Sequence, residues 1–373
     1  MDNQELKTQL RKCEHYTNSV CPFAQKVVAA LTAFIFLWSL ALPSVTAETI
    51  TVDGGTIDVT IGVDEATQQA VTNWNVSGNP VWDVPEFDIA EGATYNITGL
   101  SSGASLALLV GGGSATNIFG TMNLSNLDFI LQNVYGINIG ATGLVNVTNG
   151  NFIATTLPLN LDRTDFLSHR YEFEGDRGFI LNEGRIVGHD ASLVALVANA
   201  IENRGQIEVP AGTVALAAGK TVAIGISADG LVSIGVDEAT ANALGLSDQI
   251  KNSGSITADR GRIVLDAKAI DGLFDKAIHI EKNASAVEAV RADDGTIEFR
   301  SLDDIYNDAL VQAMNGEIKI DSGGGNVTNA EHGKMDTDTG RIEIRAGTTG
   351  RVYNAGILQT KVFDEVGYSF RST

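Results

Sequence analysis

The sequence has little cysteine, little proline and few positive charges. Its 373 residues include 2 Cys, 6 Pro and 25 Lys and Arg against 46 Asp and Glu, which gives a formal net charge of −21. This charge argues against nucleic acid and against anionic membrane surfaces as partners, because both need clustered cations. At 44% hydrophobic and 19% charged residues, the chain is suited to a large buried core rather than to disorder.

The first 47 residues have the three parts of a secretory signal peptide. The basic residues of the leader are Lys7, Arg11, Lys12 and Lys26. An apolar run of 16 residues, 27–42, follows them and ends at Pro43. Small residues at Val45 and Ala47 then predict cleavage between Ala47 and Glu48. An uncleaved membrane anchor is the alternative interpretation.

Signal removal would leave a chain without any cysteine. Cys13 and Cys21 both precede the cleavage site, so the exported chain must be stabilised by burial and backbone hydrogen bonds rather than by disulfides. No later segment approaches the 18 apolar residues that a spanning helix needs. We therefore expect no integral membrane segment after signal removal.

Residue patterns that carry catalytic or metal chemistry are also missing. The four histidines after the leader, His169, His189, His279 and His332, have no metal-ligand spacing, so polar rim positions are expected for them. Acidic pairs occur at Asp293-Asp294, Asp303-Asp304 and Asp336/Asp338; solvated loop charge is favoured for these over calcium binding or glycosidase chemistry. The sequence predicts no enzyme, no metal site and no cofactor.

Glycine is abundant, with 40 residues, and it marks a repeat. The unit G-x-[IV]-x-[LFI]-x-[AS] begins at Gly212, Gly261, Gly295, Gly316 and Gly340. Its alternation of aliphatic and polar residues is typical of a strand with one buried face. A second unit, N-x-G-x-I, begins at Asn182, Asn203 and Asn252, with a looser copy at Asn354. Each of the first three Asn residues lies nine residues before the next strand unit.

These spacings predict an all-β fold, a right-handed parallel β-helix with variable loops leaving from one side. Equivalent strands would pair one coil apart, with aliphatic residues stacked inside. Stacked Asn side chains would form ladders, and Gly would occupy corners that need positive φ or close backbone approach. Helical spacing predicts short helices on loops at 237–250 and 266–278. A β-sandwich is the alternative fold.

Several segments together resemble the secretion domain of two-partner secretion exoproteins of the filamentous haemagglutinin type. The matching stretches are Val71–Ile97, Thr116–Asn123 and Phe129–Val147, followed by the repeats. The signature loop of that family, N-P-N-G-I, corresponds to Asn133-Val134-Tyr135-Gly136-Ile137. This chain keeps the first Asn, the Gly and the Ile of the motif but lacks its Pro and its second Asn.

The resemblance implies a β-helix with an N-terminal cap and an extra antiparallel sheet. It places the cap and the secretion signal in 48–165 and further coils in 166–373. It also implies an outer-membrane β-barrel transporter, with periplasmic recognition modules, as the partner that reads Asn133–Ile137. The chain would be secreted or displayed on a Gram-negative cell surface through the periplasm, as an adhesin that binds glycans of host or neighbouring cells. A secreted β-helical polysaccharide lyase or hydrolase is the alternative function.

Overall fold

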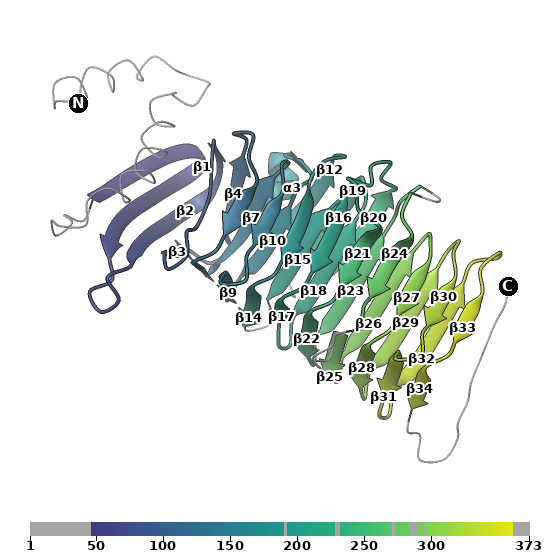
Figure 1. The fold of residues 1–373 in the computed structure, drawn as a ribbon. Helices are drawn as coiled ribbons and strands as arrows, with labels where there is room; N and C mark the ends of the chain where they lie inside the picture. Colours follow the sequence, from purple (N-terminus) through teal and green to yellow (C-terminus); the bar gives the residue numbers. More distant parts are fainter. Residues whose placement is uncertain are drawn as a thin grey trace.

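The computed structural model describes residues 46–189, 192–227, 232–270, 273–282, 290–293 and 295–360. In this part of the chain, parallel strands wind into a β-solenoid with three faces (Figure 1). The expected all-β parallel β-helix is therefore confirmed. The apolar run 27–42 lies outside the described residues, whereas Ala47 and Glu48 are exposed in the first strand.

Each coil contributes one strand to each face in a fixed order. Face 1 consists of β3 (Thr94–Gly99), β6 (Thr121–Ser125), β9 (Leu144–Thr148), β14 (Arg185–His189), β17 (Gln206–Glu208), β22 (Ser255–Asp259), β25 (Val290–Asp293), β28 (Leu310–Met314), β31 (Lys334–Thr337) and β34 (Ile357–Thr360). Face 2 consists of β4 (Ala104–Val110), β7 (Leu127–Asn133), β10 (Asn151–Thr155), β15 (Leu193–Ala198), β18 (Thr213–Ala218), β23 (Arg262–Ala267), β26 (Thr296–Ser301), β29 (Glu317–Ser322) and β32 (Arg341–Ala346). Face 3 consists of β5 (Thr116–Ile118), β8 (Ile137–Ile139), β13 (Phe179–Asn182), β16 (Ala200–Asn203), β21 (Asp248–Asn252), β24 (Lys276–Ile280), β27 (Ile305–Asn307), β30 (Val327–Asn329) and β33 (Val352–Asn354).

The predicted repeat register is the observed one. The five strands that follow the repeat glycines are β18, β23, β26, β29 and β32, and they pair in parallel with one another in sequence. Ile263, Ile297 and Ile318 stack at equivalent positions, each fully buried. One hydrophobic core runs along the axis from Ile57 to Met335. Burial of this aliphatic column is the main stabilising term of the rod.

The repeat glycines are required for close approach of successive coils. Gly261, Gly295, Gly316 and Gly340 all have ordinary φ, yet a Cβ on any of Gly295, Gly316 or Gly340 would overlap the carbonyl oxygen of the glycine one coil earlier. The same holds for Gly205 and Gly254 of the N-x-G-x-I unit. Of the two reasons expected for these glycines, tight backbone packing is the one that applies.

The predicted asparagine ladder lies inside the corner between faces 3 and 1. Asn182 Nδ2 donates to Asn203 Oδ1 at 2.7 Å, and Asn203 Nδ2 donates to Asn252 Oδ1 at 2.6 Å. A second run of the ladder joins Asn307, Asn329 and Asn354 at 2.8 and 2.7 Å. Asn203, Asn252 and Asn307 are fully buried, so the ladder satisfies amides that would otherwise be costly to bury.

Two long strands cap the N-terminal end of the rod. They are β1 (Thr46–Val63) and β2 (Ala70–Val84), and they pair antiparallel from Asp53↔Val81 to Val63↔Ala70. Thr49 Oγ1 donates to Asp58 Oδ1 at 2.6 Å, although nine residues of extended strand span about 30 Å. β1 therefore folds back on itself, and the reversal falls at Gly54, where φ is +86.

A four-stranded antiparallel sheet lies outside the solenoid over face 2. Its strands are β11 (Leu159–Asn160), β12 (Arg170–Glu174), β19 (Thr221–Ile226) and β20 (Val232–Glu238), with the short helix α3 (Arg163–Leu167) beside β12. Both segments that build it leave the rod between a face 2 strand and the following face 3 strand. A second hydrophobic cluster fills the space between this sheet and face 2, with Phe173, Val222 and Ile224 packed over Ile130 and Ile153.

The helices expected at 237–250 and 266–278 are wrong. The first segment continues β20 into turns and then enters β21, and the described residues of the second belong to β23, an irregular connection and β24. Their apolar residues pack by tertiary contact instead: Phe274 and Ala269 form a small cluster with Ala200 of β16. Among the described residues, no helix is long and apolar enough to cross a membrane.

Candidate functional site

The predicted signature loop forms a tight turn between face 2 and face 3. Asn133 ends β7 and is fully buried. Its Oδ1 accepts the N–H of Tyr135 at 2.9 Å, and its Nδ2 donates to Ser114 O at 2.9 Å and Thr116 Oγ1 at 3.0 Å. The side chain thus closes the turn and ties it to the preceding coil, which is a typical use of Asn in turns.

Gly136 and Ile137 complete the turn and start face 3. The N–H of Gly136 donates to Asn133 O at 3.1 Å, and its φ is +126. A Cβ at Gly136 would meet only ordinary contacts, so the backbone conformation, not space, favours glycine here. Ile137 is 2% exposed and pairs with Thr116 and Ile180 of the neighbouring coils.

The middle of the turn faces solvent. Tyr135 is 47% exposed, and Val134 is half-buried. In the next coil, Phe179 begins β13 and is 38% exposed, and its carbonyl oxygen lies against Gly136. The five predicted residues therefore come together as one turn, in which Asn133 and Ile137 fix the frame while Tyr135 is presented outward. The structure positions these residues but does not by itself test their role in export.

Three of the histidines pair with carboxylates on neighbouring elements. His169 Nδ1 lies 2.8 Å from Asp128 Oδ2, and His279 Nδ1 lies 2.9 Å from Asp248 Oδ2. The third pair, His332 and Asp308, is 3.2 Å apart. The hydrogen bond from Asp128 raises the pKa of His169. Sequence spacing could not reveal these pairs, because their members lie on different coils or outside the rod.

Asp128 is the centre of a buried polar contact between face 2 and the outer sheet. It is 7% exposed; its Oδ1 accepts from Asn151 Nδ2 at 2.7 Å, and its Oδ2 contacts His169 and, at 3.4 Å, the hydroxyl of Tyr171. Burial, and next the charge of Asp128, raise the pKa of the Tyr171 phenol. The carboxylate thus anchors the start of β12 to the rod.

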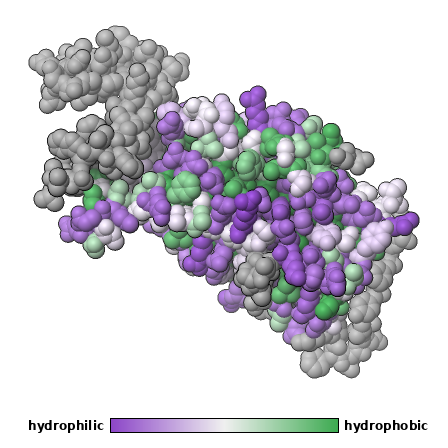
Figure 2. Space-filling model, in the orientation of Figure 1, coloured by the Kyte–Doolittle hydropathy of each residue, from purple (hydrophilic) through white to green (hydrophobic). Residues whose placement is uncertain are grey.

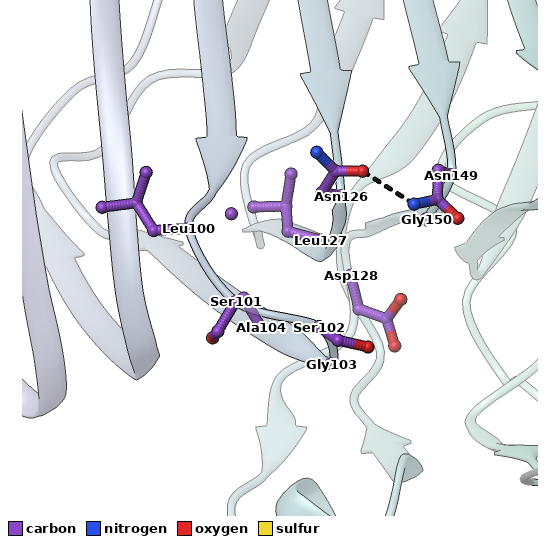
Figure 3. A pocket seen from close by; sticks show the side chains of 11 residues that line it. Leu100, Ser101, Ser102, Gly103, Ala104, Asn126, Leu127, Asp128, Asn149 and Gly150 are labelled. Carbon is purple, nitrogen blue, oxygen red and sulfur yellow. Dashed lines mark hydrogen bonds between the residues drawn. The ribbon is translucent and has the colours of Figure 1, made fainter.

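A hollow of about 290 Å³ opens beside this carboxylate, at the corner between faces 1 and 2. It is formed by the turn Gly99–Ala104 and by Asn126, Leu127 and Asn149 (Figure 3). The amides of Asn149 and Asn126 join across it at 2.7 Å. Because both oxygens of Asp128 are already hydrogen-bonded, this hollow is a gap between stacked turns rather than a reaction site.

The acidic pairs that lie within the described residues serve structural contacts. Asp304 Oδ1 accepts from the N–H of Asn326 at 2.7 Å, and Asp336 Oδ2 contacts Lys334 Nζ at 2.7 Å. The side chains of Asp293 and Asp294 lie outside the described residues. Within the described part of the chain, no group of three or more His, Cys, Asp or Glu residues is placed to hold a metal ion.

Solved structures provide the comparison that bears on the fold. The crystal structure of the HMW1 secretion domain from Haemophilus influenzae matches with a TM-score of 0.60 and 18% identity, over 86% of this chain and 84% of that one. The chain has the fold of this secretion domain. The filamentous hemagglutinin secretion domain also matches, with a TM-score of 0.40 and 14% identity, over 86% of this chain and 95% of that one.

The fold expected from the resemblance, a β-helix with a cap and an extra antiparallel sheet, is thus confirmed by the structure and by the HMW1 match. No family model matches the sequence, and no curated protein is significantly similar to it.

Proposed function

We propose that this chain is the secretion domain of a two-partner exoprotein, passed across the outer membrane by a partner β-barrel transporter. The observation that carries the proposal is the combined architecture: a capped solenoid, an outer sheet over face 2, and a signature-like turn at Asn133–Ile137 that exposes Tyr135. The fold shared with the HMW1 secretion domain supports the same assignment. The signal peptide predicted in 1–47 would deliver the chain to the periplasm.

The solenoid suits export of an extended chain. Each coil pairs mainly with its two neighbours, so coils can dock one after another as they emerge. The aliphatic column buried by each new coil disfavours backsliding without any other energy source. Because Cys13 and Cys21 both precede the predicted cleavage site, no disulfide can lock the exported chain before it is threaded.

We assign the turn Asn133–Ile137 to recognition by the periplasmic modules of the transporter. Tyr135 would be the side chain that is contacted, and Asn133 and Gly136 would hold its position. This division of roles follows from burial, since Asn133 is fully buried and Tyr135 is 47% exposed.

The test is co-expression of the chain with its transporter, followed by measurement of the fraction released into the medium. Gly136→Val should abolish release, because a β-branched residue is strained at φ +126. Tyr135→Ser should lower release without affecting folding. Tyr353→Ser is the matched control, since Tyr353 is 48% exposed on the same face far along the rod.

Circular dichroism and urea unfolding of the purified variants separate recognition from folding. Normal release of both Gly136→Val and Tyr135→Ser would remove the turn from the mechanism. Failure of the wild-type chain to be released with any partner barrel would contradict the two-partner assignment itself.

After release, we propose an adhesin role with glycans of host or neighbouring cells as ligands. Aromatic side chains recur on the outer side of face 3, with Tyr135, Phe179 and Tyr353 all more than a third exposed, and such rings can stack on sugars. Binding of the purified chain to a glycan array, compared with its Tyr353→Ser variant, tests this role. A fall in viscosity of anionic polysaccharide incubated with the chain would instead favour the lyase or hydrolase alternative.

A further inference from the structure

The N-terminal end of the rod carries an open strand edge. Among the described residues, the segment Thr46–Val52 has no partner strand other than the second half of β1, onto which it folds back. Ile50 and Val52 pack partly against the core, whereas Thr49 and Thr51 are exposed. After cleavage at Ala47, this edge would begin at the new N-terminus. Unpaired N–H and C=O groups along such an edge are a template for a further strand.

This edge lacks the features that usually prevent strand addition. No Lys, Arg or Pro occurs from Thr46 to Val63, although these residues commonly protect exposed edges. The edge of the outer sheet provides the contrast. There, Arg262 Nη1 and Arg300 Nη2 donate to the carbonyl oxygens of Val232 and Ile234 in β20, at 3.0 and 2.9 Å. One edge of this protein is thus covered by cationic side chains and the other is left open.

The charge around the open edge indicates what kind of strand would fit it. From Thr46 to Asp162 the sequence holds eleven Asp and Glu residues and no Lys, Arg or His. Nine of the eleven fall between Glu48 and Glu91, in the cap and in the segment that follows it. Among the described residues, no ion pair joins two members of 46–162, whereas ion pairs are frequent from Arg170 onward.

Passage through the inner membrane does not account for this distribution. Charges affect membrane orientation only within about 15–20 residues of the apolar segment, whereas the cation-free region extends to Asp162. General solubility does not account for it either, because the remainder of the rod mixes both signs of charge. The visible surface of that remainder is largely hydrophilic (Figure 2). A one-signed field at one end of a molecule is suited to attract an oppositely charged partner.

We propose that the open edge Thr46–Val52 receives a β-strand from a cationic periplasmic module of the transporter. The main chain of the edge supplies the hydrogen bonds of strand addition, and the carboxylates of the cap region steer the basic module toward it. This inference rests on the proposed function and adds a second contact to the turn Asn133–Ile137. The cation-free region lets the field act without competition from the chain's own Lys and Arg.

The first test measures binding of the mature chain to the purified periplasmic modules of the transporter by calorimetry. Asp83→Asn/Glu86→Gln/Glu91→Gln removes three exposed carboxylates near the cap. Asp176→Asn/Asp321→Asn/Glu331→Gln removes three exposed carboxylates from the rest of the chain and changes the net charge equally. We expect the first variant to bind about tenfold more weakly at low salt and the second to bind nearly as the wild type does. Equal effects of the two variants would overturn the electrostatic part of the proposal.

The second test addresses the edge. Thr51→Pro removes a backbone donor from the strand, and Thr51→Lys adds a protecting cation without changing the backbone. Each should weaken binding about tenfold or more while the urea midpoint of the free chain stays close to that of the wild type. Unchanged binding of Thr51→Lys would overturn strand addition. If wild-type binding depends on Tyr135 but on neither the edge nor the carboxylates, the proposed function stands and this inference fails; if the wild-type chain does not bind at all, both fail.

Discussion

Arg163 in α3 lies directly against Gly54 at the reversal of β1. A Cβ on Gly54 would overlap the Nη2 and Cζ atoms of Arg163 as well as the carbonyl oxygen of Asn79. The guanidinium also lies 5.6 Å from the ring centre of Phe166. The contact joins the cap to the first segment that leaves the rod, although 109 residues (163 − 54) separate the two in sequence.

The first prediction concerns this contact. Gly54→Ala should lower the free energy of unfolding by about 1–3 kcal/mol, because φ there is +86 and the Arg163 side chain must move. Arg163→Ala should cost less. In the double variant, the two losses should add to less than their sum, because removal of the guanidinium relieves the steric part. Urea unfolding of the four proteins measures the coupling, and strict additivity would show that the contact carries no energy.

A second prediction concerns close packing of the coils. Gly316→Ala should lower the free energy of unfolding by about 2–4 kcal/mol, because the new methyl group would overlap the backbone of Gly295, which cannot move without opening the rod. Gly62→Ala is the matched control: it has ordinary φ and nothing within 4 Å of its Cβ position, so a change of about 0.5 kcal/mol or less is expected. A similar cost for the two substitutions would refute the packing explanation.

A third prediction concerns the buried amide ladder. Asn203→Ala breaks two side-chain hydrogen bonds and leaves the Asn182 Nδ2 and Asn252 Oδ1 groups without their ladder partner. The expected loss is about 2–3 kcal/mol. Asn123→Ala removes two similar bonds, to Asn96 and Asn146, on the half-exposed outer side of face 1, where water can replace them. It should therefore cost clearly less, and thermal unfolding followed by circular dichroism can rank the two.

A fourth prediction concerns pH. Because the pKa of His169 is raised in the folded chain, its contact with Asp128 stabilises the fold fully below the unfolded pKa of about 6.5, and the benefit is lost as pH rises through the folded value. His169→Asn is a suitable comparison, since Asn tolerates the φ of +52 at this position. The difference in Tm between wild type and variant should be larger at pH 5.5 than at pH 8.5. A difference that does not change with pH would contradict a charged pair.

The strand units of the second half could be predicted because each aliphatic residue faces the same buried column. The units at Gly261, Gly295 and Gly316 gave the positions of β23, β26 and β29, and the spacing of Asn203 and Asn252 gave the inner ladder. The third strand of each coil was not predicted. Face 3 strands such as β27 and β30 have three residues, which is too short to show a period of two. Asn307 and Asn329 were missed for the same reason.

The sequence alone determined the register of the coils, because period-two burial and glycine at close-packed corners are local requirements that each coil repeats. It also brought Asn133–Ile137 together as one turn, since those residues are adjacent in the chain. Only the tertiary structure decided where the segments that leave the rod go. The outer sheet pairs β12 with β19, which begins 47 residues after β12 ends, and the Arg163–Gly54 and His169–Asp128 contacts depend on that docking. Helical spacing in 266–278 was overridden because Phe274 and Ala269 bury more surface against the neighbouring coil than they would on an isolated helix.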